Sequence, residues 1–273
     1  MCLVVFAWRV HPRYPLVLAA NRDEFLARPA APAHWWTDAP ELLAGRDLEA
    51  GGSWMGLSRG GRFAALTNYR DPCRHLAGAP SRGALVRSAL EDARDAASCL
   101  HDLAAHAKPY AAFNLLVGDG ERLGVLESTT GSVHMLRPGV YGLSNHLLDT
   151  PWPKLVKARA GLAQQLAGLA TGTDAHATGT DAHAAGSEDA LVDALLALMR
   201  DPTPAADPHL PATGVSLEWE RWLSSAFIRA PGYGTRCSSV VLRDHTAHTR
   251  FVEWTWDAHG ELRSQVEHRF RPG

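Results

Sequence analysis

Apolar runs of strand length stand at both ends of this chain, and helical stretches lie between them. Cys2 to Trp8 is one continuous run, and after a turn the pattern resumes in "LVLAA" (Leu16–Ala20). Three further runs close the chain, "RCSSVVLRD", "HTRFVEWTWD" and "ELRSQVEHRF". Because strands must pair with strands, this arrangement predicts an α+β domain in which both termini enter shared sheets.

The middle of the chain alternates hairpin, loop and helical patterns. We expect hairpin turns at Ser58–Gly61 and Asp119–Gly120, and two short strands within 131–146. "NRDEFLARP" (Asn21–Pro29) is interpreted as closing the second strand, and the proline-rich 29–52 as a loop. Helical patterns cover Ser81–Ala107, Lys154–Ala170, Glu188–Met199 and Leu217–Phe227.

A seven-residue unit, "TGTDAHA", occurs twice in succession from Thr171. Solenoid repeats are longer than this and come in larger numbers, so the duplication predicts an exposed low-complexity loop at about 171–186 with no role in chemistry. We expect the chain to form a single domain over residues 1–273 that carries this loop.

Charge and hydropathy exclude several classes of protein. The net charge is −2, so nothing calls for a nucleic acid or an anionic membrane as partner. No apolar run reaches the roughly 18 residues of a membrane-spanning helix, and the N-terminus lacks the basic region of a signal peptide. Four cysteines without metal-binding spacing predict free thiols in a cytoplasmic protein.

The first strand begins with a cysteine directly behind the initiator methionine. Free cysteine is often a small buried side chain, so one interpretation of Cys2 is a core residue. The other is a nucleophile, because removal of Met1 would leave a thiol and a free α-amine on one residue. An amine with a pKa of about 7.7–8.0 can exchange the proton of a thiol with a pKa of about 8.5 without a histidine.

Polar residues gather where the second strand ends, at Asn21, Arg22, Asp23 and Glu24. A short hairpin return would bring this strand end beside residue 2, where a carboxylate could hold an α-ammonium in place. A solvated turn is the alternative interpretation.

Two asparagines and an arginine stand at other strand ends. Asn68 and Asn145 each follow an apolar run, and their amides suit a developing oxyanion; a turn-capping side chain is the alternative for each. Arg236 opens a run whose small residues allow close approach of a neighbour, and its alternative is a structural ion pair with Asp23.

These stretches together resemble the NRDE-motif family, the relatives of transport and Golgi organisation protein two. The resemblance rests on the leading Met-Cys, "NRDE", "GGSWMGLS", "ALTNYRDP", "SRGALV" and "GLSNHLLDTPWPK". It runs from residue 1 to about 160 and resumes near Gly234.

That family is similar to the N-terminal-nucleophile hydrolases, particularly choloylglycine hydrolases and cysteine-type penicillin acylases. The resemblance implies an αββα sandwich, in which two mostly antiparallel sheets lie between helical layers. It also implies roles for residues, with Cys2 as nucleophile and its α-amine as base. By the same resemblance Asp23 positions the amine, Asn68 and Asn145 serve the oxyanion, and Arg236 organises the surroundings. The flanking Asn21, Arg22 and Glu24 are candidates for substrate binding or support.

One position departs from the pattern of the bile-acid enzymes. They carry an arginine three residues before the aspartate, where this chain has Ala20, and the arginine here is Arg22. We expect this shift to point the arginine to the other face of the strand.

Two hypotheses follow for function. The leading one is a cysteine-dependent hydrolase or acyltransferase that acts on an amide C–N bond of a small molecule and requires no cofactor. The competing one, drawn from the resemblance, is a non-catalytic protein that binds and moves haem, acyl-CoA or lipid. Fourteen histidines and Cys2 offer iron ligands, but the sequence singles out no axial pair and leaves the oligomeric state open.

Overall fold

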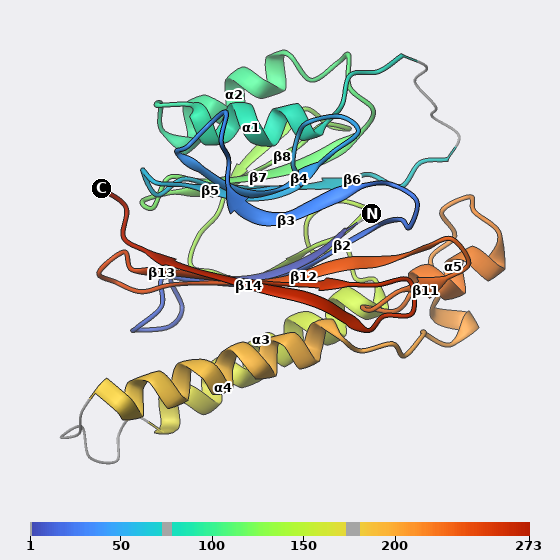
Figure 1. The fold of residues 1–273 in the computed structure, drawn as a ribbon. Coiled ribbons are helices and arrows are strands. Elements are labelled where there is room, and N and C mark those ends of the chain that lie inside the picture. The colour runs from blue at the N-terminus through green and yellow to red at the C-terminus, as the bar shows by residue number, and fades with distance from the viewer. Residues whose placement is uncertain (1, 73–77, 173–180) are drawn as a thin grey trace.

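The structure is a computed structural model that describes residues 2–72, 78–172 and 181–273. Over these residues, two seven-stranded antiparallel sheets face each other, and a pair of helices covers the outer face of each (Figure 1). The layers therefore follow the order helix, sheet, sheet, helix. This confirms the expected α+β class and the αββα arrangement.

The first sheet contains both ends of the described chain. Its strands are β1 (Cys2–Trp8), β2 (Leu16–Phe25), β10 (Gly139–Leu143), β11 (Arg229–Ala230), β12 (Tyr233–Arg243), β13 (Thr249–Trp256) and β14 (Leu262–Phe270). In space the order is β10-β1-β2-β12-β13-β14, with β11 beside β12. The two terminal segments thus share one sheet, as the sequence predicts.

The second sheet is a meander in which neighbours in sequence are neighbours in space. Its strands are β3 (Ala30–Trp35), β4 (Leu42–Asp47), β5 (Met55–Ser58), β6 (Phe63–Asn68), β7 (Phe113–Gly118), β8 (Leu123–Glu127) and β9 (Ser132–Met135). The predicted hairpins β5–β6 and β7–β8 are confirmed. At the second turn Gly120 has a φ of +93°, a conformation that a glycine adopts without steric cost.

Helices cover the outer faces of both sheets (Figure 1). They are α1 (Gly83–Glu91), α2 (Ala96–Ala105), α3 (Pro153–Gly172) and α4 (Asp181–Met199), whereas the short α5 (Leu217–Leu223) lies beside β11. The α1–α2 pair packs on the second sheet and the α3–α4 pair on the first. No helix of the described segments is long and apolar enough to cross a lipid bilayer.

The alternation of side chains along β1 explains its unbroken apolar sequence. Leu3, Val5 and Ala7 pack toward α3 and α4, whereas Val4, Phe6 and Trp8 pack between the sheets. Both faces of the strand are therefore buried. The same alternation directs the side chain of Cys2 into the space between the sheets.

Two segments predicted to be irregular are strands. The NRDE residues continue β2 to Phe25, because this stretch pairs with β1 on one side and with β12 on the other. The predicted loop 29–52 contains β3 and β4. Pro32 is tolerated because β3 is an edge strand and its pairing with β4 is irregular between Ala31 and His34.

The helical predictions need two corrections. The predicted helix Ser81–Ala107 is two helices, and the second begins where the Asp95 side chain accepts a hydrogen bond from the Ser98 N–H. The predicted loop 171–186 is partly helical, since α3 reaches Gly172 and α4 begins at Asp181. Alanine, the strongest helix former, favours this extension. The rest of the repeat, 173–180, lies outside the described residues.

A buried ion pair fastens α5 to the strand end after β6. Arg70 Nη1 lies 2.9 Å from Glu220 Oε2, and both side chains are 5% exposed. We expect Glu220→Ala to lower the free energy of unfolding by about 3 kcal/mol, because it leaves a guanidinium buried without this carboxylate. Urea denaturation measures the change. The matched control is Asp207→Ala, which removes an ion pair with Arg221 whose side chains are about half exposed and should cost under about 1 kcal/mol. Equal losses in the two variants would contradict the prediction.

Candidate active site

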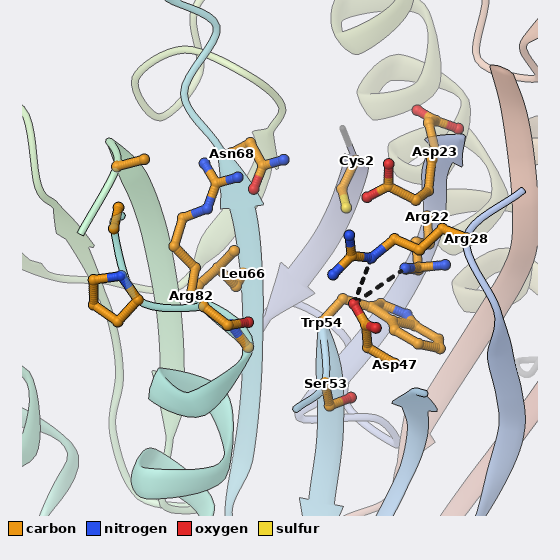
Figure 2. Close-up of a pocket in the computed structure, with 16 residues that line it drawn as sticks. Cys2, Arg22, Asp23, Arg28, Asp47, Ser53, Trp54, Leu66, Asn68 and Arg82 are labelled. Carbon is orange, nitrogen blue, oxygen red and sulfur yellow. Dashed lines mark hydrogen bonds and ion pairs between the residues drawn. The ribbon is translucent and has the colours of Figure 1, made fainter. Parts of the chain in front are cut away.

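A cavity of about 350 Å³ opens between the two sheets where β1 begins. It is lined by Cys2, Arg22, Asp23, Glu24, Arg28, Asp47, Ser53, Trp54, Leu66, Asn68, Ala79, Pro80, Ser81, Arg82, Gly83 and Ala111. Figure 2 shows Cys2, Arg22 and Arg28 on one side and Asn68 with Arg82 on the other. Its size suits a small ligand, and most of its labelled side chains are polar.

Cys2 enters this cavity through the register of β1 and β2. It pairs with Arg22, so the two side chains project from the same face of the sheet. Burial raises the pKa of the Cys2 thiol and the Asp23 carboxylate raises it further, while Arg22 and a hydrogen bond from the Asp23 backbone lower it. Its burial therefore favours the protonated form of the thiol.

Asp23 is 1% exposed, and its carboxylate Oδ1 accepts a hydrogen bond of 2.7 Å from Thr235 Oγ1. The hydroxyl of Tyr233 donates to its backbone oxygen at 2.9 Å. Burial raises the pKa of Asp23, and the positive charge of Lys154 acts most strongly in the opposite direction. Asp23 is thus a fixed carboxylate that lines the cavity together with Cys2.

The two asparagines occupy different positions. Asn68 lines the cavity, and its side chain makes no hydrogen bond within the described part of the chain, so its amide is available to a ligand. Asn145 is fully buried, and its Nδ2 donates to the backbone oxygen of Asn68 at 3.0 Å. Its neighbour Ser144 donates to the backbone oxygen of Cys2 at 3.1 Å. Asn145 therefore braces the site from behind the cavity wall.

Arg22 corrects the expectation about strand faces. Positions 20 and 22 are two apart, and they lie on the same face of β2 because side chains alternate with a period of two. Ala20 packs between the sheets, and the Arg22 guanidinium stacks 4.6 Å from the ring of Trp54 on the second sheet. The shift therefore moves the arginine along the strand without turning it away.

The other two members of the NRDE tetrapeptide point to different surroundings. Asn21 faces the helical layer, where its Nδ2 donates to the backbone oxygens of Met199 and Ala226 at 2.8 Å. It ties β2 to the end of α4 and does not line the cavity. Glu24 lines the cavity, and its carboxylate accepts from the backbone N–H of Phe25.

Arg236 lies beside the cavity rather than in its wall. Its Nη1 donates to the backbone oxygens of Phe25 and Arg28, both at 2.8 Å. It stands where the pairing of β12 with β2 shifts register, between Thr235 and Cys237. Arg236 thus holds the turn after β2, and this turn carries Arg28 into the cavity.

Several residues that line the cavity are not predicted from the sequence. Arg28 and Asp47 lie in or beside the segment interpreted as a loop, and their ion pair of 2.7 Å forms only when β2 and β4 come together. Trp54 and Arg82 belong to "GGSWMGLS" and "SRGALV", so the motifs contain them but assign them no role. The motifs therefore marked these two positions, but nothing in the sequence indicated what their side chains do.

Lys154 is a buried cation behind the site. Its side chain begins near the start of α3, is 4% exposed, and its Nζ has no hydrogen-bond partner among the residues that the structure describes. Burial lowers the pKa of Lys154 to about 8, against the attraction of Asp23, with Arg70 lowering it further and Cys2 and Glu220 raising it.

This shift predicts a pH dependence of stability. An unfolded lysine titrates near 10.5, so between about pH 8 and pH 10.5 the unfolded chain binds more protons and the free energy of unfolding rises with pH. In Lys154→Met this rise should be missing, so the free energy of unfolding of the variant relative to that of the parent should fall by roughly 3 kcal/mol across the window. Urea denaturation at several pH values measures the difference, with the exposed Lys157→Met as control. A difference between parent and Lys154→Met that does not change with pH would contradict the prediction.

The fold and cavity define an αββα sandwich protein with a cysteine facing a small polar cavity between its sheets. The chain belongs to the Transport and Golgi organisation 2 family, which it matches over residues 1–258. This confirms the family resemblance drawn from the motifs.

Relatives of known sequence match along most of this chain. It is 37% identical over 277 residues to the Transport and Golgi organization protein 2 homolog of Bos taurus and 33% identical over 279 residues to that of Homo sapiens; each match covers 93% of this chain and 92% of the relative. The Drosophila melanogaster protein is 28% identical over the full length of both chains. A solved structure, the Caenorhabditis elegans N-acylethanolamine-hydrolyzing acid amidase ortholog, is similar with a TM-score of 0.44 and 10% identity, covering 88% of this chain and 92% of that one.

Proposed function

We propose that the protein is a cysteine N-terminal-nucleophile hydrolase or acyltransferase that acts on an amide C–N bond of a small molecule. The observation that carries the proposal is that Cys2, Asp23 and Asn68 line one cavity. They supply a thiol, a buried carboxylate and an uncommitted amide donor. We place the reaction in the cytoplasm, where a reducing environment keeps the thiol free.

The proposed reaction begins once Met1 has been removed. The free α-amine of Cys2 takes the thiol proton, and the sulfur attacks the substrate carbonyl carbon to form a C–S bond. The Asn68 amide donates to the oxyanion that develops on the carbonyl oxygen. The C–N bond then breaks, the α-ammonium returns its proton to the leaving amine, and a thioester remains on Cys2. Water releases the acyl group as an acid, and an acceptor amine would release it as a new amide.

Asp23 has a positioning role in this proposal. A carboxylate near an α-ammonium holds the amine in the geometry needed for proton transfer and favours its charged form. The raised pKa of the buried thiol supports a mechanism with a base on the same residue, because a thiol in such surroundings ionises poorly by itself.

The carrier hypothesis has less support from the cavity. No histidine is among the described residues that line it, so the cavity lacks the axial ligand that most often holds haem iron. Haem, acyl-CoA and lipid binding therefore enter as alternative outcomes of the test.

The test is a screen of purified protein against a panel of acyl amides that vary in acyl length and charge, with release of free amine measured by mass spectrometry. A parallel titration with haem follows the Soret band. We expect amine release from at least one class of amide. Tight haem binding through Cys2 without turnover of any amide would contradict the proposal and favour the carrier.

A further inference from the structure

The cationic groups around Cys2 are unequally neutralised. Arg28 is paired with Asp47 at 2.7 Å and with Glu49 at 3.1 Å. Arg22 has only Asp47 at 3.9 Å, its side chain is 5% exposed, and its Nη1 has no hydrogen-bond partner among the described residues. A buried guanidinium nitrogen without a partner is costly, so a ligand that accepts from it would relieve a real deficit.

Arg82 stands across the cavity from these two arginines (Figure 2). Its Nη1 donates to the backbone oxygen of Ala112 at 3.1 Å, and no carboxylate of the described segments lies within ion-pair distance of it. The charge of a Cys2 thiolate acts on the Arg82 guanidinium, so the two residues are electrostatic neighbours. Arg82 is thus a half-buried cation on the cavity wall, facing the nucleophile without a carboxylate of its own.

The positive end of α1 adds to the same wall. This nine-residue helix begins at Gly83, which lines the cavity, directly after Arg82. Its first turn carries no acidic residue. The first N–H groups of the helix are engaged, since those of Gly83, Ala84 and Leu85 donate to Ser81 Oγ, Ser81 O and Arg82 O. The helix therefore adds the positive end of its dipole to this wall and not free N–H donors.

We propose that Arg22 and Arg82, beside the positive end of the α1 dipole, form a subsite for an anionic group, a carboxylate or a phosphate, on the substrate that Cys2 attacks. That the anion belongs to a substrate rests on the proposed function, whereas the anion subsite follows from the charged groups that line the cavity. Guanidinium groups bind both anions through charge-assisted hydrogen bonds.

The carboxylates that also line the cavity do not cancel this subsite. Asp47 is held by Arg28 and accepts from the backbone N–H groups of Glu49 and Ala50. Glu24 accepts from the backbone of Phe25, and Asp23 accepts from Thr235. Glu24 acts on the Arg82 guanidinium through its charge, but none of these carboxylates lies within ion-pair distance of Arg82 in the described segments, so its guanidinium can still bind an anion.

The first experiment compares alkylation of Cys2 by iodoacetate, an anion, with alkylation by iodoacetamide, its neutral analogue. Peptide mapping gives both rates. The rate with iodoacetate is divided by the rate with iodoacetamide, and this ratio is normalised to the same ratio for free cysteine. We expect the normalised ratio to fall about tenfold in Arg82→Gln, as the loss of one charge-assisted hydrogen bond implies. Arg82→Lys should keep much of it. Arg122→Gln removes the same charge from an exposed turn and should leave the ratio unchanged.

The second experiment measures binding of glutarate, phosphate and neutral glutaramide by calorimetry in the same variants. We expect an anion to bind to the parent and to Arg122→Gln, with about tenfold weaker binding in Arg82→Gln, and glutaramide to bind poorly throughout. The tighter of the two anions identifies the group. Anion binding that does not depend on Arg82, or no preference for anions over glutaramide, would overturn the subsite. A Cys2 that reacts with neither alkylating reagent would count against the nucleophile while calorimetry still decides the subsite.

Discussion

Cys2→Ala is expected to lower turnover of any accepted amide by at least about a thousandfold, because it removes the atom that attacks the carbonyl. Cys2→Ser should also be severely impaired, since a hydroxyl is far less acidic than a thiol and this α-amine is positioned to take the proton of a thiol. The free energy of unfolding should change by only about 1 kcal/mol, because one small side chain at a strand start is altered. Amine release and urea denaturation measure the two effects.

The matched control for this prediction is Cys99→Ala. Cys99 is a fully buried thiol on α2, in the core between the helices and the second sheet. Its loss changes packing away from the cavity, so turnover per folded molecule should remain. Turnover that survives in Cys2→Ala would end the nucleophile proposal.

Asp23→Asn is expected to lower turnover by at least about a hundredfold, because misplacing the base relative to the thiol by a small distance has an effect of this size. The amide has nearly the shape of the carboxylate and can still accept from Thr235, so the wall of the cavity is kept. What it loses is the negative charge that holds an ammonium.

Turnover per folded molecule, with folding checked by circular dichroism, measures this loss. The control for a lost carboxylate is Asp207→Asn. Asp207 is an exposed aspartate that forms an ion pair with Arg221 of α5. Full activity in Asp23→Asn would show that the amine is oriented by something other than Asp23.

Much of the fold could be predicted because most of its strands have clear apolar sequence patterns. β1 is an unbroken apolar run buried on both faces, and the two hairpins carry the Gly-containing sequences that tight turns favour. The failures lie where tertiary pairing overrides local composition. The polar NRDE residues remain in β2 because β12 pairs with the whole stretch and β1 with its first two residues, and β3 tolerates its proline because it is an edge strand.

The candidate site divides along a similar line. Cys2, Asp23 and Asn68 could be grouped because each stands at the end of an apolar run and the set matches the motifs of one family. The structure brings them together from two facing sheets, with Cys2 and Asp23 in the first and Asn68 in the second. Asn145 and Arg236 come to the same region, but as braces of Asn68 and of the turn after β2. The roles of Arg82 and Lys154 could not be predicted. They depend on the absence of an ion-pair or hydrogen-bond partner in the described segments, which only the packing of the chain reveals.

Peptide mapping of the N-terminus of catalytically active protein shows directly whether Cys2 is the nucleophile. The proposed mechanism requires Cys2 to be the first residue, with its α-amine free, and a substrate-derived acyl group on its sulfur during turnover. We predict an N-terminal peptide that begins at Cys2 and gains the acyl mass on the thiol when substrate is present. An active protein whose N-terminal peptide still begins with Met1 would contradict the account.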